Sequence, residues 1–147
     1  MHSKRIAFLA FAIVFSSAVF AEQIQYKYGN YHFTYDDPSL DIENIGESFM
    51  ALRGVFTGIC GFNPDPDKYP ARVRILADRE AYNEYLQTRI GETRNQYVFL
   101  KYGKPELSEL VIFPAAGTGF ASFSGPSLNR QLFLQYLYSY ILEPPLW

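Results

Sequence analysis

The chain has 147 residues, enough for one ordinary domain with a hydrophobic core. Its 13 basic and 15 acidic residues give a net charge of −2, and no basic cluster is interleaved with aromatic residues, so nucleic acids and anionic membrane surfaces are not expected partners. The single cysteine, Cys60, excludes an intramolecular disulfide framework, so stability must come from burial, for which aromatic residues supply 18% of the chain.

The first 21 residues have the three parts of a secretory signal peptide. Lys4 and Arg5 give a positive start, residues 6–15 are apolar, and small residues follow, with Val19 and Ala21 at the positions that a signal peptidase reads. We therefore expect an exported protein, periplasmic or extracellular, that is cut after Ala21. A retained anchor is the alternative, but the apolar run is shorter than the roughly 20 residues of a spanning helix, so no stable transmembrane anchor is expected after cleavage.

Residues 22–147 are expected to form a single α+β domain with a mixed sheet of about four or five strands. They hold 11 of the 13 basic residues and all 15 acidic ones, which gives a net charge of −4. Alternating aromatic residues predict strands around a turn at Gly29-Asn30, which form either a hairpin or one bulged strand. This alternation places His32 and Thr34 on a polar face.

An apolar stripe with three- and four-residue spacing predicts an amphipathic helix near residues 42–60. The residues of this stripe are Ile42, Ile45, Phe49, Leu52, Phe56 and Ile59. Ser39 or Asp41 is expected to cap the start of the helix, and Gly61 follows its end. Gly46 lies within the helix, where the lack of a side chain would allow a close approach to the sheet.

Three further strands are predicted after this helix, at residues 72–76, 97–102 and 109–113. Asp78 is expected to cap a short helix between the first and second of them.

A buried helix is predicted near residues 127–142, capped by Ser127 and apolar on more than one side. The same residues also alternate, so a strand is the alternative. The length of the segment and the serine cap favour the helix.

The motifs that would carry metal or nucleophilic chemistry are incomplete in this chain. After the signal peptide there is one histidine, His32, and one cysteine, too few for a zinc site of histidine and cysteine ligands. A loop that starts at Asn63 begins like a calcium loop, but its sixth position is lysine and its twelfth is arginine. No Gly-x-Ser-x-Gly elbow or complete phosphate-binding glycine loop is present. We expect no metal, no cofactor and no catalytic residue, with His32 exposed on its strand and Cys60 in the core.

The order of the predicted elements and the ending Pro144-Pro145-Leu146-Trp147 resemble the amino-terminal part of a gluzincin, or peptidase MA-like, metallopeptidase domain. In that family a mixed sheet precedes a buried helix that carries His-Glu-x-x-His, and a segment with tryptophan and a glutamate ligand follows. The resemblance places Gln131 and Gln135 at the two histidines and Leu132 at the general base. Glutamine is a poor zinc ligand and leucine cannot accept a proton. The resemblance therefore implies a degenerate, truncated and inactive site.

We accordingly expect an exported, non-catalytic, peptidase-like domain with a binding or scaffolding role in the cell envelope. Its ligand would be an unknown protein or peptide. A cleft, if formed, is expected between residues 117–126 and the last helix. Two alternatives stay open: a cryptic hydrolase with an unrecognised site, and an unrelated exported interaction protein.

Overall fold

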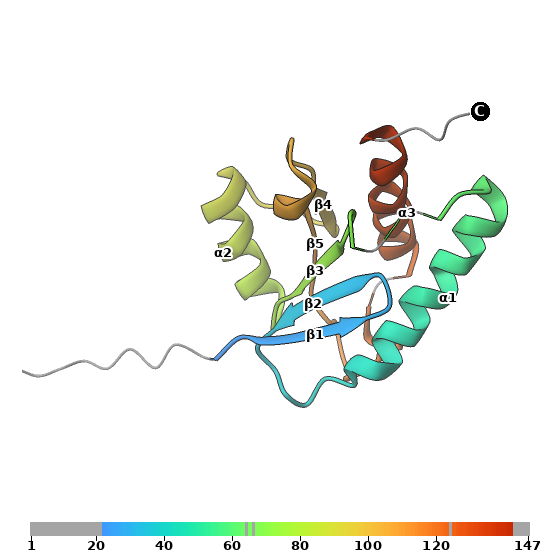
Figure 1. Cartoon of the computed structure of the whole chain (residues 1–147). Helices are drawn as coiled ribbons and strands as arrows, with labels where there is room; N and C mark the ends of the chain where they lie inside the picture. The colour runs from blue at the N-terminus through green and yellow to red at the C-terminus, as the bar shows by residue number, and fades with distance from the viewer. Residues whose placement is uncertain (1–21, 64, 66, 124, 143–147) are drawn as a thin grey trace, which may run out of the picture.

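The computed structural model describes residues 22–63, 65, 67–123 and 125–142 (Figure 1). The predicted signal peptide and the Pro-Pro-Leu-Trp ending lie outside the described residues. The α+β prediction is confirmed, with a five-stranded mixed sheet and three helices. The elements in chain order are β1 (Ile24–Tyr28), β2 (Tyr31–Tyr35), α1 (Ile42–Cys60), β3 (Ala71–Ile75), α2 (Arg79–Ile90), β4 (Val98–Leu100), η1 (Pro105–Leu107), β5 (Glu109–Ile112), η2 (Phe120–Ser122) and α3 (Gly125–Leu142).

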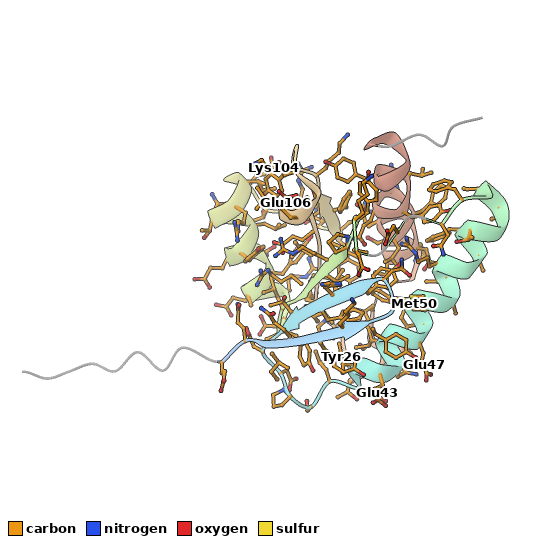
Figure 2. The ribbon with its side chains drawn as sticks, viewed as in Figure 1. Tyr26, Glu43, Glu47, Met50, Lys104 and Glu106 are labelled. Carbon is orange, nitrogen blue, oxygen red and sulfur yellow. The ribbon has the colours of Figure 1, made fainter. Side chains whose placement is uncertain are left out.

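The sheet has the strand order β1-β2-β3-β5-β4. The two central pairs, β2 with β3 and β3 with β5, are parallel, and both outer pairs are antiparallel. The β1–β2 turn falls at the predicted Gly29, whose φ of 55° favours glycine. A Cβ atom there would also lie 2.6 Å from the sulfur of Met50, which Figure 2 shows on α1 beside this hairpin.

Helices cover the two faces of the sheet unequally (Figure 1). We call the side that carries α1 and α3 the packed face and the other side, which α2 covers in part, the open face. On the packed face, the Phe49 ring of α1 lies 5.2 Å from the Tyr31 ring and 5.5 Å from the Phe33 ring, both in β2. On the open face, Tyr85 of α2 donates a hydrogen bond to Glu109 of β5.

Most of the sequence features predicted for α1 are confirmed. Asp41 is its N-cap, and the Asp41 side chain accepts a hydrogen bond of 3.2 Å from the Asn44 amide. Gly46 makes the predicted close approach, since an added Cβ would lie 2.6 Å from the Tyr28 ring. The stripe was wrong at its last position: Ile59 is 76% exposed, and Arg53 is buried instead, with 3% exposed. Arg53 lies between β2 and α3, against the rings of Tyr31 and Tyr136.

The predicted helix at the end of the chain is confirmed and the alternative strand is wrong. The cap was also wrong, because α3 begins at Gly125, two residues before Ser127. The Ser127 hydroxyl accepts a hydrogen bond from the Tyr97 amide at 3.2 Å instead, at the start of β4.

The remaining elements follow the sequence closely. Asp78 caps α2, because its side chain accepts a hydrogen bond of 2.8 Å from the Ala81 amide. β4 is shorter than the predicted 97–102, because the backbone amide of Tyr102 bonds to the Ser108 hydroxyl and leaves the sheet pairing. Of the helices that the structure describes, none is long and apolar enough to cross a membrane.

Candidate functional site

The structure places the three predicted site residues on α3, where each contacts the core or the sheet. Leu132 is fully buried. The Gln131 side-chain oxygen accepts a hydrogen bond from the Phe99 amide of β4 at 2.9 Å. The Gln135 side-chain nitrogen donates to the backbone carbonyl of Arg72 in β3 at 2.9 Å. Both glutamines are therefore engaged with strand backbone.

The Gln131 bond is one of a pair along β4. Ser127 and Gln131, one helical turn apart, accept hydrogen bonds from the amides of Tyr97, just before β4, and of Phe99 within it. Four helical residues rise about 6 Å and two extended residues span about 6.6 Å, so the two spacings match. Gln131 thus occupies an amide of an edge strand that would otherwise be open to pairing with another chain.

Other predicted features of the site have mixed outcomes. Among the described residues, no group of three or more His, Cys, Asp or Glu side chains could hold a metal ion. Cys60, expected in the core, is half-buried and packs against the edge of the core. A hollow of about 240 Å³ lies beside the start of α3, but of the described residues in the expected border 117–126 only Pro126 lines it, with Tyr97 and Phe113 among the others.

Sequence analysis missed a row of cationic residues across the open face. The strand register sets Lys27 of β1 opposite His32 of β2, and His32 opposite Arg72 of β3. Adjacent strands lie about 4.8 Å apart, so Lys27 and Arg72 flank His32 on its two sides, with the Arg72 guanidinium directed toward the Glu106 carbonyl. Alternation in β1 and β2 predicted their polar face, but the parallel pairing that adds Arg72 joins segments far apart in the sequence.

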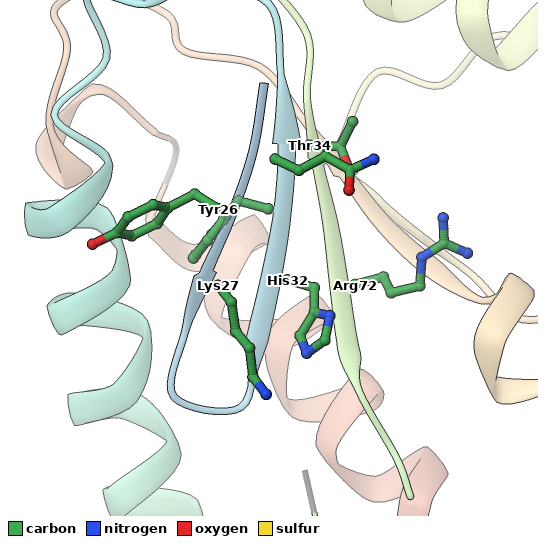
Figure 3. Close-up of a pocket in the computed structure, with 7 residues that line it drawn as sticks. Tyr26, Lys27, His32, Thr34 and Arg72 are labelled. Atoms are coloured by element: carbon green, nitrogen blue, oxygen red, sulfur yellow. The ribbon is translucent and has the colours of Figure 1, made fainter. Parts of the chain in front are cut away.

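These three residues line a hollow of about 290 Å³ on the open face. Figure 3 shows it in close-up, with Lys27 beside the imidazole of His32, and Thr34 further along the same strand. The remaining lining residues are Gln25, Tyr26 and Phe33, so the lining contains no carboxylate.

A second hollow of about 400 Å³ shares Arg72 with the first and continues toward α2, where it is lined by Arg89 and Glu109 among others. The Glu109 carboxylate is already engaged: Arg74 Nε lies 3.2 Å from its Oε2, and the Tyr85 hydroxyl donates to its Oε1. The charge of this one buried acid is thus compensated within the sheet face.

The surroundings of His32 disfavour its charged form. Burial lowers its pKa, Lys27 and Arg72 lower the pKa further, and Asp67 opposes them. The Nε2 atom of His32 is buried, and no described residue forms a hydrogen bond with it. His32 was predicted to be exposed; it is half-buried, because side chains of the adjoining strands surround it.

The chain was compared with protein-family models, with curated proteins and with solved structures, and no match was found.

Proposed function

We propose that this protein is an exported, non-catalytic, peptidase-like domain that binds a protein or peptide ligand in the cell envelope. The observation that carries the proposal is the use of Gln131 and Gln135 in hydrogen bonds to the strand backbone. At the positions that the resemblance gives to zinc ligands, both side chains serve to fix α3 on the sheet.

A catalytic role for these residues would need their rearrangement. Binding a metal through Gln131 would take the acceptor away from the partly buried Phe99 amide, and a typical hydrogen bond contributes about 1 kcal/mol. Leu132 is fully buried and has no group that could take a proton from water. Both points support a domain that retains the peptidase-like arrangement of elements without its chemistry.

The open face is the surface best suited to ligand binding. The packed face is covered by α1 and α3, whereas the open face presents two adjoining hollows that share Arg72. Polar hollows beside partly buried charged groups are common features of binding sites.

The test combines metal analysis with a hydrolysis assay on the purified protein. We expect less than stoichiometric zinc and no turnover of a broad peptide library, before and after zinc addition. Gln131→Ala should lower the free energy of unfolding by about 1 kcal/mol through the lost hydrogen bond to the Phe99 amide. Arg130→Ala, its exposed neighbour on α3, serves as the matched control.

Three results would contradict the proposal in different ways. Stoichiometric zinc with turnover that Gln131→Ala abolishes would establish a metallopeptidase. Metal-free turnover that survives this variant would establish a cryptic hydrolase. An N-terminus that still carries the first 21 residues, determined on protein from the envelope fraction, would contradict cleavage after Ala21.

A further inference from the structure

We propose that the hollow around His32 binds one tetrahedral oxyanion, the group that a phosphate or sulfate ester presents, with Lys27 and Arg72 as its cationic anchors. The proposal rests on the binding role of the open face and adds the chemical class of the group that is recognised there.

The first observation is the charge that flanks His32. The register sets Lys27 on one side of His32 and Arg72 on the other, so two cations border an imidazole whose charged form they disfavour. Lys27 forms an ion pair of 3.8 Å with Asp67, which is 86% exposed. Such a surface pair contributes little, so an incoming anion can replace it.

The second argument is the size and donor set of the hollow. Its volume of about 290 Å³ is lined by the neutral donors Gln25 and Thr34 as well as the cations. The flanking guanidinium of Arg72 donates to the Glu106 carbonyl and has further N–H groups to offer. The next row along the strands contains Arg74, two residues after Arg72 in β3, and Glu109 already neutralises it. The hollow around His32 is therefore lined by Lys27 and Arg72 as its permanent cations, which suits a single anionic group.

The third argument is the unsatisfied imidazole. His32 Nε2 is buried without a hydrogen-bond partner among the described residues, which is a costly arrangement. An oxyanion supplies acceptor oxygens and the negative charge that favours a protonated ring. Lys27 of β1, Arg72 of β3 and Asp67 of the loop before β3 are the charged groups that act on this ring, and the two cations disfavour its protonation in the free protein.

The test is a titration of the purified protein with sodium sulfate at constant ionic strength. Binding is monitored through the NMR signals of the His32 imidazole. Sodium chloride and sodium acetate are the reference salts. Lys27→Gln and Arg72→Gln should each weaken sulfate binding about tenfold, since a hydrogen bond to a charged group is lost. Arg130→Gln removes the same charge from an exposed position on α3 and should change the dissociation constant less than twofold. Equal melting temperatures of the variants confirm that they are folded.

A pH series adds a readout that non-specific charge attraction would not give. Sulfate keeps its double charge between about pH 5 and 8, so tighter binding at the acid end reports protonation of the imidazole. In the His32→Asn variant, sulfate should still bind, but more weakly and with an affinity that no longer depends on pH. Repeating the titration with inorganic phosphate and with glycerol 3-phosphate distinguishes a free anion from an ester as the preferred source.

Equal responses to sulfate and acetate, or sulfate binding that Arg130→Gln weakens as much as Lys27→Gln, would overturn the proposal. So would the absence of saturable sulfate binding. These outcomes concern the ligand class, whereas zinc with turnover would overturn the proposed function, so the two failures are distinguishable.

Discussion

The packed and open faces of the sheet differ in how they satisfy their side chains. On the packed face, apolar residues of β2, β3 and β5 meet α1 and α3 in one aromatic core. On the open face, Arg74 forms a buried ion pair with Glu109 where α2 covers the sheet, whereas Lys27, beside His32, forms only an exposed ion pair with Asp67. One face therefore supplies most of the apolar core, and we propose that the other binds the ligand.

The largest expected effect comes from the centre of the packed face. Phe49 is fully buried among Tyr31, Phe33 and Phe120, with ring centroids 5.2, 5.5 and 5.9 Å away. Phe49→Ala should lower the free energy of unfolding by about 3–5 kcal/mol, measured by urea denaturation. Leu134→Ala, at a position that is 43% exposed, is the control and should lower the free energy of unfolding much less than Phe49→Ala does. Equal losses for the two variants would contradict the assignment of the core.

A smaller effect is expected at Arg53, a buried cation of the packed face. The Arg53 guanidinium lies 6.0 Å from the Tyr31 ring centre and 5.4 Å from the Tyr136 ring centre, and its Nε and Nη2 have no hydrogen-bond partner among the described residues. Replacing a buried charge by an apolar side chain of similar length often stabilises a protein.

Arg53→Met should therefore raise the free energy of unfolding by about 1 kcal/mol in the same denaturation assay. Arg53→Lys retains the charge and serves as the comparison variant. We expect no rise in its free energy of unfolding. A loss of stability in the methionine variant would show that the contacts of the guanidinium with both tyrosine rings outweigh its desolvation.

The smallest effect concerns the open face at acid pH. The pKa of His32 is lowered in the folded protein, so the unfolded state binds a proton more readily. The resulting stability is fully present above the unfolded pKa of about 6.5 and is lost as the pH falls below it, by less than about 1.4 kcal/mol per pH unit. His32→Asn should flatten this part of the stability curve, measured by thermal unfolding between pH 7 and 5. An unchanged slope would mean that other groups cause it.

Local signals predicted most of the fold. Asp41 and Asp78 were recognised as caps because a cap depends on a side chain and an amide three residues away. Apolar periodicity located α1 and α3, and alternation located the strands. The inward position of Arg53 was missed because it depends on where α3 crosses α1, which no local pattern encodes.

The candidate sites were harder to predict for the same reason. Gln131 and Gln135 were singled out through a resemblance, but their bonds to Phe99 and Arg72 depend on the docking of α3 against the sheet. The hairpin pairing of Lys27 with His32 could be inferred from the turn at Gly29. The addition of Arg72 required the parallel pairing of β2 with β3.

The most direct test of the division between the two faces is a map of backbone amide shifts on addition of sulfate to the ¹⁵N-labelled protein. The account predicts that the saturable shifts cluster on β1, β2 and β3 around Lys27, His32 and Arg72, and that amides of α1 and α3 stay unchanged. Saturable shifts centred on α1 or α3, with the row around His32 unaffected, would contradict it.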